Sequence, residues 1–416
     1  MPVIKPFKAF RPEPELVTKV ASPPYDVLNS EEARQLVKNN PYSFLHVNKA
    51  EIDLDSSVDH YDQKVYEKAS ENLNKLIKER AYLQDEQEKI YIYRQIMKGR
   101  AQTGLVVCVS IDDYLNGKIK KHENTREDKE RDRINHIDFT DANTGPVFLT
   151  YKAKDEISQV ISRWTKEKEP VYNFTSEDEI THTCWVIDDR SIIQQLIESF
   201  AKIDYLYIAD GHHRAAAATK VGLKRRGEFK DYTGKEEFNY FLSVLFPHDE
   251  LYIMDYNRVV ADLTGNSEEE FIQKISEKFT MERYSEEKPY RPETRHTFGM
   301  YLDNCWYKPT VKPGTFDEDD AVDSLDVSIL QNNLLTPILE IEDPRTDQRI
   351  EFVGGIRGLE ELEKRVRAGM KVAFSLYPTS IEELMKVADA KRLMPPKSTW
   401  FEPKLRSGIF IHKLSE

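Results

Sequence analysis

Residues 205–218, with the sequence YLYIADGHHRAAAA, constrain the fold of this chain more than any other stretch. Residues 205–209 are apolar and favour a buried strand. Asp210 and Gly211 are typical of a sharp turn, because glycine adopts backbone angles that other residues avoid. Residues 215–218 are all alanine, the strongest helix former. The sequence therefore predicts a covered strand that passes through a tight turn directly into a helix.

Three basic side chains, His212, His213 and Arg214, occupy the predicted start of that helix. A helix N-terminus presents free N–H groups and the positive end of the helix dipole, so it binds anions and disfavours cations. The alternative is a surface turn with incidental histidines, although the chain has only 10 histidines in all. The pattern favours a site for phosphate or another anion, in which Asp210 orients a partner or ligates a metal.

The tetrapeptide HENT, at residues 122–125, is the second candidate. Glu123 stands beside His122 between a predicted strand and a predicted helix, which suits a general base. Thr125 is counted with the candidate phosphate-binding residues. The alternative is a solvated face, because nearly every residue of 120–133 is charged.

A third candidate is the basic C-terminal segment that contains Lys397, Ser398, Lys404 and Arg406. Lysine, arginine and hydroxyl side chains around tight turns suit phosphate or carboxylate binding. The alternative is a segment fixed by proline and tryptophan packing, with its basic groups in solvent. Arg258 is a weaker candidate for an anion clamp, and a structural role is the alternative.

A chain of 416 residues is too long for one core, so two or three packed lobes are expected. Strands and helices alternate throughout, which predicts a mixed α/β or α+β protein. A strand is expected over residues 43–47, and a hairpin from residues 89–97 and 103–111. The expected division is an N-terminal α/β lobe over 1–95, a core with HENT and DGHHR over 96–265, and a C-terminal α/β lobe with the MPPKSTWF tail over 266–416.

Composition excludes several classes of function. The formal net charge of −13 argues against nucleic-acid binding, which needs a basic surface. The three cysteines lack zinc spacing, and neither GxGxxG nor GxxxxGK[ST] occurs. The N-terminus lacks the apolar core of a signal peptide, and no apolar run approaches the roughly 18 residues of a membrane span. We expect a cytoplasmic protein with small-molecule partners, and a homo-oligomer is compatible with the sequence.

DGHHR followed by an alanine-rich helix resembles the helix-start motif of the ParB/sulfiredoxin-like superfamily, which binds nucleotide phosphates. Within that superfamily the motif is most similar to that of free serine kinases. Those enzymes have a His-Glu pair after a strand, then a polar helix, then the Asp-Gly-His-x-Arg turn. Here His122 and Glu123, a helix from Glu127, and residues 210–214 keep that order, with longer spacing than in the small members. This resemblance covers residues 110–220, about a quarter of the chain.

A second resemblance covers nearly the whole chain. The landmarks PF-A-RP, SPPYDV, HENT, DGHHRAAA, NRVV and MPPKSTWF-PKLRSG occur in the order seen in a large bacterial and archaeal family, domain of unknown function 1015. The family often lies near serine-biosynthesis genes. The resemblance thus implies a ParB/sulfiredoxin-like core with additional N- and C-terminal lobes, and phosphotransfer involving serine or phosphoserine with ATP or ADP and Mg²⁺.

The resemblance also implies roles for individual residues. Glu123 would take the serine hydroxyl proton, and Asp210 would orient the substrate amine or Mg²⁺. His212, His213 and Arg214 would hold the transferred phosphoryl group or the nucleotide β-phosphate. The candidate catalytic residues are Glu123, Asp210 and His212. The candidate substrate- or phosphate-binding residues are His122, Thr125, Gly211, His213, Arg214, Arg258, Lys397, Ser398, Lys404 and Arg406.

Two other functions stay open. One is a ParB-like regulator that binds nucleotide or DNA without turnover, against which the acidic charge weighs. The other is a metal-dependent hydrolase built on His122, Glu123, His212 and His213. Neighbouring histidines diverge, which disfavours a zinc site on His212 and His213 alone, whereas His122, Glu123 and His212 could converge in space. The phosphate donor and the direction of transfer are not fixed by the sequence.

Overall fold

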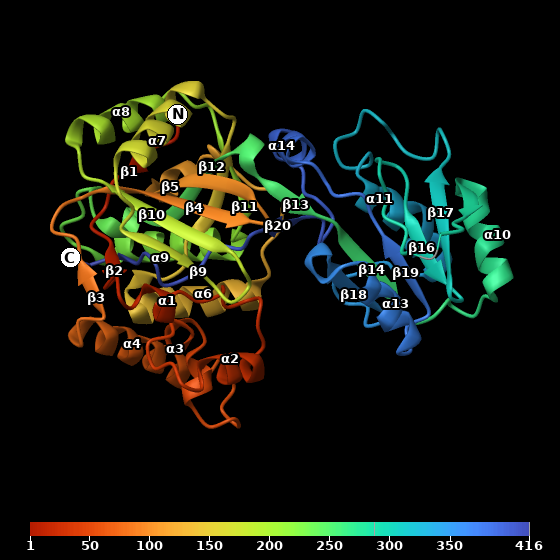
Figure 1. Cartoon of the computed structure of the whole chain (residues 1–416), viewed down its shortest axis with the longest axis horizontal. Helices are drawn as coiled ribbons and strands as arrows, with labels where there is room; N and C mark the ends of the chain where they lie inside the picture. The colour runs from red at the N-terminus through yellow and green to blue at the C-terminus, as the bar shows by residue number, and fades with distance from the viewer. Residues whose placement is uncertain (287, 416) are drawn as a thin grey trace. The chain divides into compact units, whose positions relative to one another are not determined.

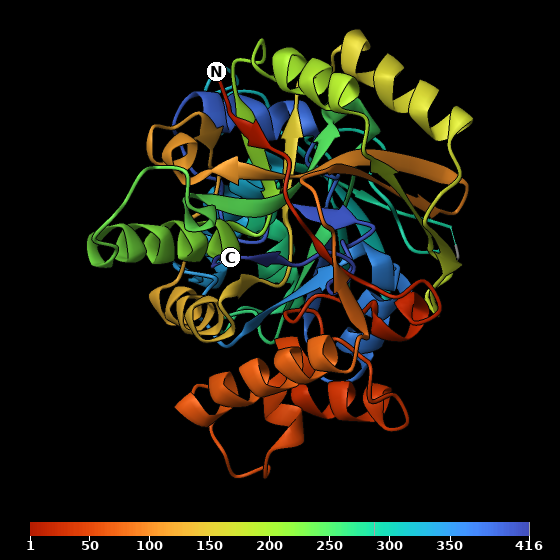
Figure 2. The same ribbon diagram turned by 90° about the vertical axis from the view of Figure 1, so that its left-hand side faces the viewer.

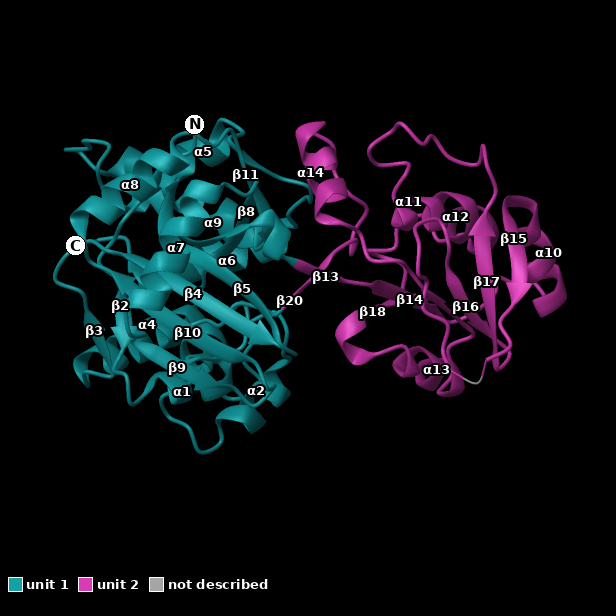
Figure 3. Ribbon diagram, turned by 45° about the horizontal axis from the view of Figure 1, so that its top comes forward, with its two compact units in different colours: residues 1–251, 403–416 teal, residues 252–402 magenta. Residues whose placement is uncertain are grey.

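The computed structural model describes residues 1–286 and 288–415. The chain forms two compact units, coloured separately in Figure 3. Unit 1 contains Met1–Leu251 and the C-terminal residues from Pro403 onward, and unit 2 contains Tyr252–Glu402. The expected division after residue 95 differs from this one, because residue 95 lies inside a strand of the unit 1 sheet.

Unit 1 is built on a large mixed sheet (Figure 1). Its strands follow in the order β6 (Ile119–Lys120), β11 (Leu206–Asp210), β8 (Val147–Tyr151), β12 (Tyr240–Pro247), β5 (Arg100–Ser110), β4 (Ile90–Met97), β10 (Thr181–Ile187) and β9 (Tyr172–Thr175), and β1 (Ile4–Lys5) pairs with β5.

The pairing in this sheet is mostly antiparallel, but β11 is parallel to β6 and β12 is parallel to β8. The predicted hairpin is confirmed as β4 and β5, which pair from Met97 and Arg100 outward. Lys98 and Gly99 form its turn with φ of 50° and 80°. Two residues with positive φ match the right-handed twist of the strands that they join.

Helices cover the unit 1 sheet. Side chains of α7 (Asp155–Glu167), α8 (Arg190–Phe200) and α9 (His212–Glu228) share one apolar core with the sheet. A further layer, drawn in red to orange in Figures 1 and 2, contains α2, α3 and α4. The remaining bounds in unit 1 are α1 (Val17–Val20), α2 (Ser30–Val37), α3 (Leu45–Asn48), α4 (Gln63–Lys78), α5 (Ile111–Leu115), α6 (Glu127–Thr140), β2 (Phe10–Pro12), β3 (Tyr82–Gln84), β7 (Ala142–Asn143) and β21 (His412–Lys413).

The strand expected over residues 43–47 is wrong, because this segment enters the helix α3. Phe44 and Val47 pack into one core, and Leu45 packs into another. A spacing of three residues places two side chains on the same face of a helix, whereas a strand would place them on opposite faces. The short apolar run thus fits the period of a strand or of a helix, and packing against these two cores favours the helix.

Unit 2 has its own antiparallel sheet. The strands follow in the order β15 (Phe279–Arg283), β17 (Cys305–Val311), β16 (Gly299–Leu302), β19 (Val372–Ser375), β14 (Tyr256–Val260) and β18 (Ile350–Gly354). The expected mixed α+β class is therefore confirmed. Its other elements are α10 (Glu268–Lys278), α11 (Asp326–Leu330), a π-helical turn (Gln331–Leu335), α12 (Thr336–Leu339), α13 (Glu360–Arg367), α14 (Ile381–Asp389), and the paired strands β13 (Tyr252–Met254) and β20 (Trp400–Glu402).

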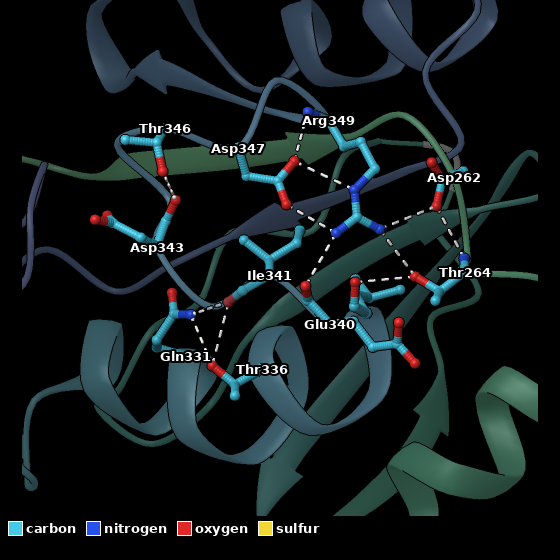
Figure 4. Close-up of polar contacts among 11 residues, drawn as sticks. Asp262, Thr264, Gln331, Thr336, Glu340, Ile341, Asp343, Thr346, Asp347 and Arg349 are labelled. Atoms are coloured by element: carbon cyan, nitrogen blue, oxygen red, sulfur yellow. Dashed lines mark hydrogen bonds and ion pairs between the residues drawn. The ribbon is translucent and has the colours of Figure 1, made fainter.

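Arg349, just before β18, joins two connections of unit 2 (Figure 4). Its guanidinium donates to Asp347 (2.8 Å from Nη2), to the hydroxyl of Thr264 (3.1 Å) and to the backbone carbonyl of Glu340 (3.0 Å). The planar fork of arginine allows this simultaneous donation in several directions.

No helix in the described part of the chain is both long and apolar enough to cross a bilayer.

Candidate functional site

The strand, turn and helix predicted at residues 205–218 are present. β11 ends at Asp210, and α9 begins at His212. Gly211 between them has φ of 95°, in the left-handed region. A Cβ at this position would lie 3.0 Å from Arg214 Nε. Only glycine therefore allows this turn while the guanidinium of the first helical turn folds back over it.

The Arg214 side chain is held in place and is only 9% exposed. Its Nη2 donates to Asp210 Oδ2 at 2.8 Å, and its Nη1 donates to the backbone carbonyl of Pro146. Lys404 Nζ lies 3.7 Å from the other carboxylate oxygen of Asp210. Asp210 thus lies between two cations, which suits it to orient Arg214 and Lys404 and disfavours it as a metal ligand.

The HENT segment lies beside this turn because β6 pairs in parallel with β11. Both strands leave the sheet at the same edge, so the residues that follow them are neighbours. Glu123 Oε2 lies 3.8 Å from His212 Nδ1. The rings of His122 and His212 pack at right angles, with centroids 4.4 Å apart. The structure therefore brings the candidate base to the start of α9.

Both imidazoles in this group are buried, and burial lowers their pKa. The pKa of His122 falls to about 4, and the pKa of His212 also lies well below its ordinary value. Both rings are therefore neutral at pH 7. His122 Nδ1 and His212 Nε2 are buried without a hydrogen-bond partner among the described residues. A neutral imidazole nitrogen that carries a lone pair can bind a metal ion.

The next two candidates order the loop in front of α6. His213 Nε2 accepts a hydrogen bond of 3.0 Å from the backbone N–H of Arg126. The Thr125 hydroxyl donates to Glu130 Oε2 at 2.8 Å. Glu130 is in turn paired with Lys220 on α9. These contacts hold the loop that precedes α6 against α9. Thr125 and His213 therefore stabilise the backbone around the site, whether or not they also bind a ligand.

A cavity of about 30 Å³ lies against Arg214, with room for roughly two water molecules. Arg133 is buried there, with its guanidinium 3.9 Å from the centroid of the Tyr25 ring. Asn48 Oδ1 is buried and has no hydrogen-bond partner among the described residues. Sequence reasoning does not single out Arg133, because it lies in a run where nearly every residue is charged. The polar lining includes Tyr25, Asn48, Arg133, Thr144, Arg214 and Ser407.

Other sequence candidates make structural contacts. Arg406, in unit 1, donates to Ser176 Oγ at 3.0 Å and pairs with Asp178. Arg258, Lys397 and Ser398 belong to unit 2. There Arg258 is 3% exposed and donates to the backbone carbonyl of Lys397 at 3.0 Å. The Ser398 hydroxyl donates to the backbone carbonyl of Pro395 at 2.6 Å.

Fold and site together define a two-unit α+β protein with the DGHHR turn between a buried strand and a helix. The chain belongs to the family described as protein of unknown function (DUF1015), whose model matches residues 4–328. The resemblance to this family is thereby confirmed over residues 4–328, which contain five of the six landmarks, and the MPPKSTWF-PKLRSG tail lies outside the matched residues. No curated protein sequence matches the chain.

Several solved structures are similar to this chain at low identity. A mutant of free serine kinase in complex with ADP is 14% identical, with 71% of this chain and 87% of that chain covered and a TM-score of 0.36. A conserved hypothetical protein from Pyrococcus furiosus is 15% identical over 76% and 96% of the two chains, with a TM-score of 0.36. SbnI with a C-terminal truncation, from Staphylococcus aureus, is 11% identical over 73% and 85%, with a TM-score of 0.36. Such TM-scores do not establish equivalent residues.

Proposed function

We propose that unit 1 transfers a phosphoryl group between a nucleotide and free serine. One observation carries the proposal: Glu123 Oε2 lies 3.8 Å from His212 Nδ1. A carboxylate that can take a proton therefore lies beside a helix start that can hold a phosphate. A general base and an anion cradle at one point are the parts that phosphoryl transfer to a hydroxyl needs.

The start of α9 is suited to hold the transferred phosphoryl group. The first N–H groups of a helix have no partner within it, and the helix dipole favours an anion there. Arg214 is fixed by Asp210 and Pro146, so little side-chain entropy is lost when it meets a phosphate oxygen. Lys404, close to the same aspartate, adds positive charge. Prearranged donors of this kind stabilise charge that develops in the transition state.

In the direction of phosphoserine formation, Glu123 takes the proton of the serine hydroxyl. The serine oxygen then forms a bond to the terminal phosphorus of ATP or ADP. The bond from that phosphorus to the bridging oxygen breaks, and the nucleotide leaves with one phosphate fewer. The reverse reaction uses the same groups, and water in place of the nucleotide as acceptor would hydrolyse phosphoserine.

The cavity against Arg214 completes the proposal. Its volume of about 30 Å³ fits a carboxylate, and it is lined by the guanidinium groups of Arg133 and Arg214, which are also paired with Asp132 and Asp210. A serine whose carboxylate entered this cavity would be held beside Arg214, which also contacts the Asp210 turn. We also propose that the core of unit 1 has a ParB/sulfiredoxin-like fold.

The experiment uses tag-free, full-length protein with serine and either ATP or ADP, and detects phosphoserine by mass spectrometry. The reverse reaction is followed from phosphoserine with ADP or AMP. We expect Glu123→Gln to lower turnover by about 100-fold or more while nucleotide affinity is unchanged, since a general base contributes ~10²–10⁴-fold. Glu127→Gln is the matched control, because Glu127 is an exposed carboxylate on the same segment and pairs only with Arg131.

Two alternatives predict different results. A ParB-like regulator would bind nucleotide without turnover in either direction. A metal-dependent hydrolase is favoured by the grouping of His122, Glu123 and His212, and it would release phosphate from phosphoserine without a nucleotide. Absence of turnover in all assays, together with nucleotide binding that is unchanged in Arg214→Met, would refute the proposed function.

A further inference from the structure

We propose that His122, Glu123 and His212 form a site for a transition-metal ion such as Zn²⁺, and not for the Mg²⁺ that the family resemblance implies. Each residue offers one ligand atom, and these atoms all lie within 4.8 Å of one another. Within residues 1–286 and 288–415, this is the one such group of His, Cys, Asp and Glu. The site does not depend on serine being the substrate, and while Glu123 ligates an ion it does not act as the general base of the proposed transfer.

Hydrogen bonding at the two imidazoles supports a metal. Among the residues that the structure describes, buried His122 Nδ1 has no hydrogen-bond partner, while the ring donates to the backbone of Ile208. A histidine ligand commonly donates its second N–H to a backbone carbonyl, which fixes the tautomer that binds metal. His212 Nε2 is also buried without a partner. Leaving a buried polar atom unpaired is costly, and an ion bound to His122 Nδ1 and His212 Nδ1 would remove that cost at His122, while His212 Nε2 would stay unpaired.

The spacing of the ligands fits a small ion after a slight contraction. Two ligands at 2.0–2.1 Å from a tetrahedral zinc ion lie roughly 3.4 Å apart. The distance from Glu123 Oε2 to His212 Nδ1 is 3.8 Å. Glu123 has a half-exposed side chain on a loop, so its carboxylate can approach the rings without disturbing the core. The two rings are held by the sheet edge and by α9.

The chemistry of the donor atoms selects the ion. Mg²⁺ is bound by oxygen ligands and keeps several waters, whereas imidazole suits Zn²⁺, Co²⁺ and related ions. Two imidazoles and one carboxylate therefore do not fit Mg²⁺. Asp210, the oxygen ligand expected for Mg²⁺, instead lies between Arg214 and Lys404. Three protein ligands leave a position for a substrate oxygen or water, as in catalytic zinc sites.

The test measures metal binding alone on tag-free, full-length protein from which metal has been stripped. Calorimetric titration with Zn²⁺, Co²⁺ or Mg²⁺ should show one Zn²⁺ or Co²⁺ per chain, bound at least about 100-fold more tightly than Mg²⁺, since imidazole ligands follow the order of transition-metal affinity. Co²⁺ should also give visible absorption bands of a low-coordinate site. Because no nucleotide or serine is present, this result is independent of the proposed function.

Variants locate the ion. Glu123→Gln and His212→Asn should each weaken Zn²⁺ binding by more than about 10-fold, since even second-shell changes cost ~10–100-fold. His213→Asn is the matched control, because His213 is the next residue and its Nε2 is already engaged by Arg126. Circular dichroism and melting curves show which variants are folded. Mg²⁺ binding as tight as Zn²⁺ binding, no binding at all, or equal Zn²⁺ affinity in Glu123→Gln, His212→Asn and wild type would overturn the proposal.

Discussion

Replacing Gly211 by alanine tests whether the DGHHR turn needs glycine for its backbone conformation alone or also for its close contact with Arg214. The residue has φ of 95°, and an added Cβ would lie 3.0 Å from Arg214 Nε and 3.1 Å from Cζ. Gly117 provides the matched control. It has φ of 71° in the same unit, and a Cβ there would meet no atom within 4 Å. Both changes strain the backbone, but only Gly211→Ala pushes a guanidinium aside.

The expected magnitudes follow from these contacts. A left-handed conformation costs an L-residue about 1–2 kcal/mol. Each kcal/mol shifts the melting temperature of a domain of this size by roughly 2–4 °C. Both variants should therefore melt several degrees below wild type. Gly211→Ala should in addition lose the contact of Arg214 with a bound phosphate, worth about 1.5–3 kcal/mol or roughly 10–100-fold in nucleotide affinity.

The assay combines scanning fluorimetry with calorimetric titration of ATP and ADP at a temperature where both variants are fully folded. We expect Gly117→Ala to keep wild-type affinity and Gly211→Ala to lose it. Wild-type affinity in Gly211→Ala would refute the placement of the anion at Arg214. Equal loss in both variants would show that affinity follows global stability and not this contact.

Three further predictions concern pH, unit 2 and Lys404. Burial lowers the pKa of His136 to about 4, so its contribution to stability is present above pH 6.5 and is lost as the pH falls towards 4. In urea unfolding, the loss of unfolding free energy between pH 7 and pH 5 should be smaller in His136→Gln than in wild type by about 2 kcal/mol, and the other buried histidines with a lowered pKa contribute their own loss in both proteins. Arg349→Lys should destabilise unit 2 by about 1–2 kcal/mol in hydrogen exchange, because lysine cannot form the fork of hydrogen bonds. The control Arg345→Lys should change stability by less than about 0.5 kcal/mol, because Arg345 is exposed and pairs only with Asp343. Lys404→Gln should weaken ADP binding about 10-fold with an unchanged melting curve, since it removes one charge beside Asp210.

Local features were predictable from the sequence. The strand, turn and helix at residues 205–218 follow from β-prone residues, a glycine and four alanines in succession. The β4–β5 hairpin follows from two alternating runs around Lys98 and Gly99. The strand predicted over residues 43–47 is wrong because the apolar pattern is too short to distinguish a strand period of two from a helix period near four. Packing into the surrounding core favours the helix.

The site was only partly predictable, because it depends on pairing between distant segments. Glu123 approaches His212 through the parallel pairing of β6 with β11, and nothing in either strand specifies the other as its neighbour. Arg133 is buried against Tyr25, yet its sequence surroundings are those of a solvated helix. Charge alone does not distinguish an arginine that faces a cavity from one that faces water.

The return of the chain to unit 1 after unit 2 has a consequence during synthesis. The last residues supply β21, which pairs with β7, and they also supply Lys404 beside Asp210 and Ser407 at the cavity. A ribosome must therefore make all of unit 2 before unit 1 can close its site. A nascent chain that has not yet reached residues 404–413 would hold the DGHHR turn without these later partners.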